Sequence, residues 1–341
     1  MEYILNESPV KTTNNFDINN IKINLDLNLD YLFNNYEFKN KNNINITETD
    51  EDNYSSNIGL KHDKYKKLNI NVDRNYILND TFVINYDSNK SNSIIDEINF
   101  NLEENSNINV LLVYKLNGKT FHDGTINFNL KKGSKLNITL VSESSKESIN
   151  ITDFNSSLDD DSKLKLNIID LYGSKRIYRS TGITNTKSNN NINMIFGGKN
   201  DELIDINYYL SNEKEYSNNN INIEGCLFDK ANKHFKGTID FKEGSSLSVG
   251  KERENTLLLS NDAISKSLPI MLCHEENVEG SHAVSTGKPD LEKLFYLESR
   301  GVSYSDALNM MIKANYSFIL NEVPSDIKEY IEDFINDYLD K

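Results

Sequence analysis

The densest collection of reactive side chains in this sequence is the segment Cys273–His282 (CHEENVEGSH). Thiolate, imidazole and carboxylate groups are ligands that transition metals such as iron accept. His274 and His282 are eight residues apart, so on an extended chain both face one side while Cys273 faces the other. This disfavours a Cys-His-His site made by the segment alone. The segment predicts a ligand or transfer role for His282, with a hydrogen-bonded structural histidine as the alternative, and Glu279 is a candidate oxygen ligand near it.

The remaining cysteines and histidines point to structural roles. Two cysteines are too few for a disulfide framework, and we expect Cys226 and Cys273, which lie in apolar stretches, to be buried structural residues. Gly197-Gly198 is typical of a turn. The isolated histidines are expected at the surface or at corners: His62, His122 and His234. No P-loop, dinucleotide fingerprint, nucleophile elbow, C-x-x-C or H-E-x-x-H motif occurs, which favours a protein that is not itself an enzyme.

The charge of the chain limits its partners. Lys and Arg number 37 against 52 Asp and Glu, a formal charge of −15, which disfavours nucleic acid because phosphate contacts need clustered cations. The basic cluster Lys61–Lys67 is short, and we expect a solvated loop, with a local anion site as the alternative. The abundant Asn needs no structural role. Because neither a signal peptide nor an apolar run of about 20 residues occurs, we expect a cytoplasmic protein without a membrane partner.

The elements that must position these residues are mainly strands. Residues 1–60 are irregular, with an alternating stretch Ile21–Leu29 and an acidic loop Thr47–Asp52. Residues 61–285 alternate between apolar and polar side chains with the period of half-buried strands. A polar turn followed by [S/N]-x-[I/L]-x-[V/I/L/M] recurs there at spacings of 28, 28, 28, 29 and 26 residues, starting at Ser106, Ser134, Ser162, Asn190, Asn219 and Ser245.

Such a fixed period indicates stacked units that cannot bury their apolar faces alone. Strand-only units with polar corners fit a parallel β-helix, so the sequence predicts a mainly β protein of this class. Two alternatives stay open: biased Asn-Ile alternation that imitates a period, and a β-sandwich, which would not predict a regular spacing of 28.

Residues 286–341 predict a small C-terminal α-helical domain of three helices. Asp290 is a candidate N-cap with Gly301 as the stop, Ser303 opens a second helix, and Pro324-Ser325 begins a third with apolar residues at i, i+3, i+4 and i+7. These helices carry more apolar side chains than they can bury among themselves. We therefore expect them either to cap the end of the β-helix or to form a docking face.

Four segments occur in the order and spacing of a known family: Gly225–Gly237 (GCLFDKANKHFKG), Arg253–Ala263 (RENTLLLSNDA), Val278–Ala283 (VEGSHA) and Leu294–Val302 (LFYLESRGV). Over about residues 223–318 the chain closely resembles the SufB/SufD core domain of iron–sulfur cluster assembly. The resemblance implies a right-handed parallel β-helix with a C-terminal helical domain, and a scaffold subunit of the SUF complex rather than an enzyme. The alternative is a non-catalytic structural or carbohydrate-binding β-solenoid.

The resemblance also implies partners and site residues. Family members pair through their β-helices, as SufB–SufD heterodimers or as homodimers, and their C-terminal helices bind the SufC ATPase. Docking candidates on these helices are Leu294, Phe295, Leu297, Arg300, Met310 and Met311.

The family histidine at the dimer interface matches His282, which becomes the candidate metal-binding residue for a transient iron–sulfur cluster, with no stably bound cofactor implied. The interface cysteines of the family fall on Gly280 and at about Glu254, and the SufB-type glutamate falls at about Ala283. Because both thiols are missing, the chain resembles a SufD-like supporting partner more than the sulfur-accepting SufB.

Overall fold

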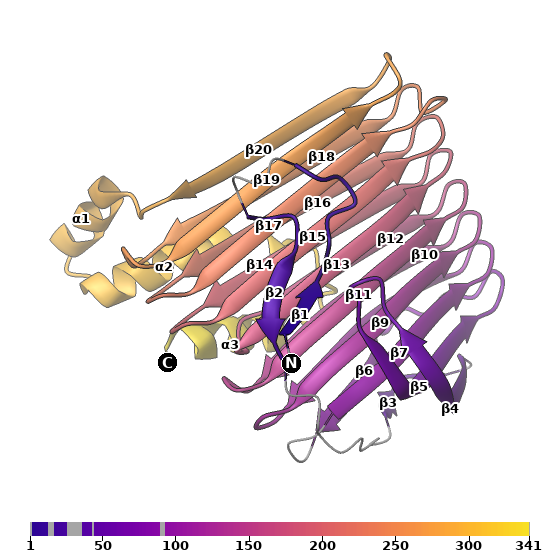
Figure 1. Cartoon of the computed structure of the whole chain (residues 1–341), viewed down its shortest axis with the longest axis horizontal. Helices are drawn as coiled ribbons and strands as arrows, with labels where there is room; N and C mark the ends of the chain where they lie inside the picture. Colours follow the sequence, from indigo (N-terminus) through magenta and orange to yellow (C-terminus); the bar gives the residue numbers. More distant parts are fainter. Residues whose placement is uncertain (1, 13–16, 26–35, 43, 89–92, 341) are drawn as a thin grey trace.

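The body of the protein consists of two nine-stranded sheets whose strands are visited alternately by the chain (Figure 1). This computed structural model describes residues 2–12, 17–25, 36–42, 44–88 and 93–340. We call the sheet with the order β20-β18-β16-β14-β12-β10-β8-β6-β3 the even sheet, and the one with the order β19-β17-β15-β13-β11-β9-β7-β5-β4 the odd sheet. From β5 onward the neighbours within each sheet are parallel, so the predicted parallel β-helix is confirmed. Its right hand stays a prediction.

The strands are short and similar in length over most of the body. Their bounds are β1 Glu2–Leu5, β2 Ile21–Asn24, β3 Glu37–Lys39, β4 Asn45–Ser55, β5 Lys61–Val72, β6 Phe82–Ser88, β7 Ser93–Leu102, β8 Asn107–Leu116, β9 Phe121–Leu130, β10 Lys135–Ser144, β11 Ile149–Leu158, β12 Lys163–Asp170, β13 Lys175–Thr184, β14 Asn189–Gly198, β15 Leu203–Asn212, β16 Asn218–Leu227, β17 Asn232–Phe241, β18 Val249–Leu258, β19 Ile264–Cys273 and β20 Glu279–Gly287.

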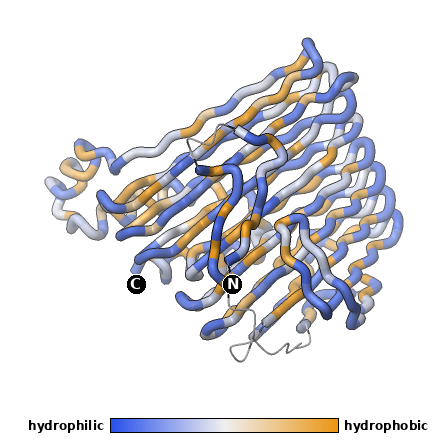
Figure 2. Tube along the Cα trace, viewed as in Figure 1, coloured by the Kyte–Doolittle hydropathy of each residue, from blue (hydrophilic) through white to orange (hydrophobic). Residues whose placement is uncertain are grey.

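The main core lies between the two sheets. Alternate residues of both sheets point into it, and Figure 2 shows the resulting alternation of hydrophobic and hydrophilic residues along the strands. Parallel pairing places Phe128 directly above Phe100, and the ring stack continues through Phe154 and Tyr178, each displaced by two positions from register. Successive ring centroids are 5.8, 6.4 and 6.3 Å apart. The core is therefore continuous along the helix axis, although no single coil could bury its own apolar face.

A serine marks the same corner of successive coils. The strand register aligns Ser106, Ser134, Ser162, Ser188, Ser217 and Ser248, at spacings of 28, 28, 26, 29 and 31 residues. In the first five, the hydroxyl donates to the carbonyl three residues earlier and so closes the turn. The predicted period is confirmed, but three of its starts are out of register. Asn190 and Asn219 lie two residues past the corner serine, because Asn-Ile alternation continues there, and Ser245 lies three residues before Ser248.

The abundant asparagines do have a structural role, contrary to our expectation. The Asn99 side chain donates to Asn69 at 3.0 Å, Asn127 to Asn99 at 2.8 Å and Asn155 to Asn127 at 3.2 Å. Each amide thus links one coil to the next along the outer face of the odd sheet. Such ladders favour parallel, in-register stacking because the same residue type must recur in every coil.

The first strands of the body pair by charge. Acidic β4 lies antiparallel to basic β5, and Lys66 forms a 2.5 Å ion pair with Glu48. The predicted acidic loop Thr47–Asp52 and the predicted basic loop Lys61–Lys67 are therefore both wrong. Opposite charges on neighbouring strands stabilise pairing, which a linear reading of either segment does not reveal.

Layers on opposite outer faces cover the β-helix. The antiparallel pair β1–β2 lies on the outer face of the odd sheet, where Leu5 and Ile21 pack with Ile151 and Ile177 (Figure 1). The C-terminal helices pack on the outer face of the even sheet, against residues such as Val141. The expectation that these helices cap the end of the β-helix is therefore wrong.

The helices begin and end close to the predicted places. Asp290 accepts hydrogen bonds from two backbone N–H groups, Ser303 exchanges hydrogen bonds with Asp306, and Gly301 has a φ of +91° after the first helix. None of the helices in the described ranges is long and apolar enough to cross a membrane. Their bounds are α1 Leu291–Ser299, α2 Tyr304–Tyr316, a 3-10 turn η2 Ile319–Asn321 and α3 Lys328–Leu339.

Candidate functional site

The last coil leaves one end of the β-helix open. Strands β19 and β20 are the free edges of their sheets, and β20 is exposed from Glu279 to Thr286. The opposite end is closed by the antiparallel strands β3 and β4, and Tyr36 and Ile44 cover the core there. A free edge offers unpaired N–H and C=O groups to another strand. The open end is therefore the natural place for a second protein to extend the sheets.

His282 lies on β20 at this open end and is exposed. It is the direct register partner of Glu252 on β18, whose carboxylate points between the sheets toward Gly237. Glu279 lies three residues before His282, hence on the other side of the strand, and forms a 3.2 Å ion pair with Lys251. The two predicted ligands, His282 and Glu279, therefore lie on opposite sides of the strand. His282 instead lies beside Glu252, which the sequence analysis did not predict.

A buried polar cluster occupies the mouth of this end. Lys233 donates to Glu254 at 2.7 Å and to Ser267 at 2.8 Å, and Ser267 donates to the second Glu254 oxygen at 2.8 Å. Burial lowers the pKa of Lys233, which the Glu254 carboxylate opposes. Burial, with a contribution from Glu254, raises the pKa of Glu252 to about 8. Glu252 is therefore mainly protonated at neutral pH, although its position faces the open end.

Within the described ranges, no group of three or more His, Cys, Asp or Glu side chains is placed to hold a metal ion.

The two cysteines differ in environment. Cys226 is buried as expected, with its Sγ 3.0 Å from the Tyr316 hydroxyl beneath α2. Cys273 is exposed, so its predicted burial is wrong. Its strand is apolar enough to be a core strand, but it is the last of the odd sheet and has no neighbour on one side.

The three isolated histidines are buried, so their predicted surface or corner positions are wrong: His62, His122 and His234. His62 lies 2.9 Å from Asp123, and His122 lies 3.3 Å from Asp96. Each buried ring is matched by a carboxylate one or two coils away in the stack, a pairing that sequence spacing alone does not reveal.

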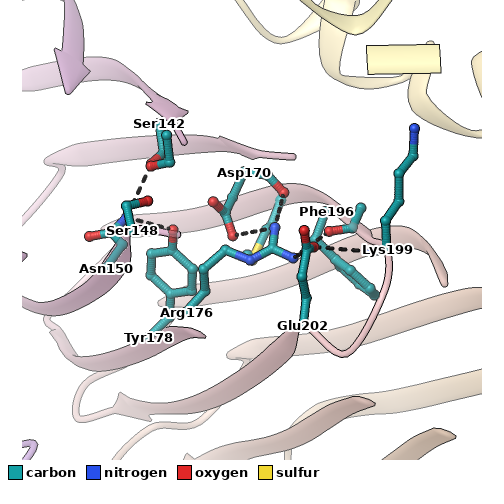
Figure 3. Close-up of polar contacts among 12 residues, drawn as sticks. Ser142, Ser148, Asn150, Asp170, Arg176, Tyr178, Phe196, Lys199 and Glu202 are labelled. Carbon is teal, nitrogen blue, oxygen red and sulfur yellow. Dashed lines mark hydrogen bonds and ion pairs between the residues drawn. The ribbon is translucent and has the colours of Figure 1, made fainter. Parts of the chain in front are cut away.

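An interior chain of polar side chains crosses several coils of the β-helix (Figure 3). Asn150 accepts from His122 at 2.7 Å, and its amide group donates to Tyr178 at 3.1 Å and to Ser142 at 3.2 Å. Burial, together with the nearby charge of Asp170, raises the pKa of the Tyr178 hydroxyl. No motif marks these residues, and the only sequence signal is that each takes an inward position of the alternating pattern.

The same chain ends in a buried ion network. The carboxylates of Asp170 and Glu202 flank the Arg176 guanidinium at 3.3 and 2.9 Å. All three side chains are almost fully buried (Figure 3). Burial raises the pKa of Asp170 to about 6, although Arg176 opposes the shift. Arg176 also donates to the Gly197 carbonyl at 2.6 Å. The network fixes the strand ends around it and exposes no nucleophile.

The end of β14 is held from outside as well. The Tyr316 hydroxyl of α2 donates to the Phe196 carbonyl, and Lys199 donates to the Tyr338 carbonyl of α3 at 3.0 Å. Gly197, predicted in a turn, is instead a buried strand residue in contact with the Tyr338 ring. The segment 196–202 therefore joins the interior ion network to the helical layer.

The helical layer contains a groove of about 510 Å³ between α1 and α2. Three docking candidates line it: Leu297, Met310 and Met311. Phe295 is 72% exposed beside the groove, whereas Leu294 is 2% exposed and cannot contact a partner directly. The Arg300 guanidinium lies 5.4 Å from the centroid of the Tyr296 ring. Figure 1 shows α1 extending away from the strands, which leaves the groove accessible.

Comparisons with known proteins agree with these observations. Residues 82–315 match the family described as "SUF system FeS cluster assembly, SufBD core domain". The iron–sulfur cluster assembly protein SufD of Bacillus subtilis is 32% identical over 100 residues, which cover 29% of this chain and 23% of that protein. SufD of Escherichia coli is 28% identical over 135 residues, 40% of this chain and 32% of that protein.

A SufBD-family protein of Synechocystis is 28% identical over 100 residues, 29% of this chain and 22% of that protein. The matched segments thus span less than a third of the length of each of these relatives. The family match, in contrast, covers more than half of this chain. It includes the β-helix from β6 onward, the exposed strand with His282, and the groove between α1 and α2. The chain belongs to the SufB/SufD family of iron–sulfur cluster assembly proteins.

Proposed function

We propose that this chain is a SufD-like scaffold subunit of the SUF complex, which supports iron–sulfur cluster assembly in the cytoplasm without catalysing a reaction itself. The observation that carries the proposal is the open end of the β-helix, where the unpaired strand β20 presents His282. The family match and the SufD names of its relatives support the same role.

The pairing partner is a SufB-like chain or a second copy of this chain, and it joins at the open end. Among the described strands, only those at this end form free parallel edges. At the other end β3 and β4 are antiparallel to their neighbours, and β4 carries exposed acidic side chains that disfavour edge-to-edge pairing. The cluster is transient cargo at the joint. His282 supplies one ligand, and the partner supplies the rest because this chain lacks a complete donor set in its described part.

The second partner is a SufC-type ATPase, which docks in the groove between α1 and α2. Its lining combines apolar side chains that include Met310 and Met311 with the charged residues Asp290, Glu292 and Lys293, and such adaptable, mixed surfaces suit protein docking. Because α2 and α3 pack on the even sheet, a movement of the docked ATPase is passed through these helices to the strands.

Capture of the ATPase tests the docking proposal. Co-expressed with the SufB-type and SufC-type chains of the same organism and purified anaerobically, the wild type is expected to retain the ATPase. The double variant Leu297→Glu/Met310→Glu is expected to lose capture about tenfold or more, because two carboxylates would be buried in an apolar contact. Ile183→Glu, at an exposed apolar residue of β13, is the matched control and keeps full capture. Undiminished capture by the groove variant would sink the docking proposal.

Cluster yield tests the role of His282. In the same purified complex, His282→Ala is expected to lower the iron and acid-labile sulfide content several-fold, because one ligand of the shared site is removed. Capture of both partners stays unchanged, since the exposed ring contributes nothing to folding of the chain. An unchanged iron and sulfide content would remove His282 from the site while leaving the scaffold role standing.

A further inference from the structure

The open end contains a buried carboxylate that no cation neutralises. Glu252 is 3% exposed, and its Oε1 is shielded from solvent without a hydrogen-bond partner in the described part of the chain. Gly237 lies opposite, where an added Cβ would be 2.4 Å from that oxygen, so the facing strand leaves room only for the carboxylate. Burial of an unpaired polar group is costly, and a native protein normally supplies a partner.

The cationic side chains near Glu252 already pair with other carboxylates. Lys233 pairs with Glu254 on the inner side of the coil. On the outer side, Lys251 pairs with Glu279 at 3.2 Å and Arg253 with Glu224 at 3.1 Å. On the adjacent strand β17, Lys236 pairs with Asp205, and Lys242, which directly follows that strand, pairs with Asp240. None of these described cations is left to match Glu252, so a partner can supply the charge.

Other interior carboxylates do have internal partners. Asp170 and Glu202 share Arg176, and Asp96 faces His122. Glu252 differs from them in place, because it lies beside the free strand β20 and not deep in the stack. A buried carboxylate without a hydrogen-bond partner, at the open end of the β-helix, is suited to receive a cationic side chain from another protein.

We propose that Glu252 is the acceptor for a lysine or arginine side chain that the pairing partner inserts into the open end of the β-helix. The proposal rests on the proposed pairing at this end and names the chemistry of its contact. An ammonium or guanidinium group needs a single carboxylate, whereas a metal ion needs further donors, and the described residues contain no group of three metal-binding side chains.

The test is the strength of pairing with and without the Glu252 carboxylate. The dissociation constant is measured by analytical ultracentrifugation, with a chelator present, for the SufB-type chain of the same organism and for self-association. For the pairing partner, Glu252→Gln is expected to bind at least tenfold more weakly than the wild type, because the inserted cation lacks its counter-charge.

One variant acts as the control. Glu276→Gln, at an exposed turn residue, also removes one carboxylate and is expected to bind the partner like the wild type. The Glu252→Gln chain should fold, since Gln resembles a protonated Glu, and circular dichroism and thermal unfolding check this.

Three results would overturn the proposal. One is an equal dissociation constant for the wild type and for Glu252→Gln. Another is a difference between the two chains that appears only when ferrous or manganous ion replaces the chelator, which would indicate a metal site. The absence of pairing with both partners would remove the pairing proposal as well, whereas pairing of equal strength in the two chains would remove only the role of Glu252.

Discussion

Replacement of Arg176 with Met is expected to lower the free energy of unfolding by about 3–5 kcal/mol, the range for breaking a buried ion pair from one side. The guanidinium is fully buried, pairs with Asp170 and Glu202, and donates to the Gly197 carbonyl. Met keeps much of the side-chain volume but leaves two buried carboxylates without a counter-charge. Urea unfolding followed by circular dichroism measures the difference.

The surface provides the control for this change. Arg253→Met removes an ion pair with Glu224 whose arginine side chain is 65% exposed, and it is expected to cost about 1 kcal/mol or less. The triple variant Arg176→Met/Asp170→Asn/Glu202→Gln is expected to recover part of the loss, because the stranded charges are gone. If Arg176→Met costs no more than the surface variant, the buried network contributes little to stability.

The coil repeat could be read from the sequence because stacking makes the fold periodic. Equivalent corners carry serine in every coil from Ser106 to Ser248, and a local capping pattern marks the starts of α1 and α2. Both signals come from residues that lie close together in the sequence. The ion network is only partly local, because Asp170 and Arg176 are six residues apart but Glu202 meets them only when the next coil is stacked in register.

The placement of the helical layer had a signal that we did not use. Strand β8 contains the unbroken run Val110–Val113, with Leu112 in the inner core and Leu111 and Val113 in the outer one. A strand that is apolar on both faces is covered on both faces. This pattern predicts a layer outside the even sheet, and the C-terminal helices supply it.

The exposure of Cys273 could not be predicted from the sequence of its own strand. The run Leu268–Cys273 resembles a core strand, yet it is half-buried to exposed because β19 is the last strand of the odd sheet. An apolar strand that the chain itself leaves uncovered suits an interface with another protein. The error in burial and the proposed pairing therefore have the same physical origin.

Substitution of Ala for Gly197 is expected to displace helix α3 from the even sheet. A Cβ at this position would lie 2.3 Å from the Tyr338 hydroxyl oxygen and 2.4 Å from the ring carbon that carries it. The ring cannot easily retreat, because Lys199 lies 4.2 Å from its centroid and the Tyr172 ring packs against it at 5.1 Å. Overpacking of this kind costs about 1–3 kcal/mol. Hydrogen–deuterium exchange of residues 328–339 should become faster in the variant.

Two further variants show whether the clash itself is responsible. Gly287→Ala adds a Cβ that meets nothing within 4 Å, so it should leave both stability and exchange unchanged. Tyr338→Leu removes the ring, and Gly197→Ala should therefore cost less in that background than in the wild type. Because the Gly197 carbonyl also accepts from Arg176, the same contact links α3 to the interior ion network. Two results together would contradict this link: unchanged hydrogen–deuterium exchange in α3, and an equal loss of stability from Gly197→Ala in the wild type and in Tyr338→Leu. They would mean that the position of α3 does not depend on its contact with Gly197.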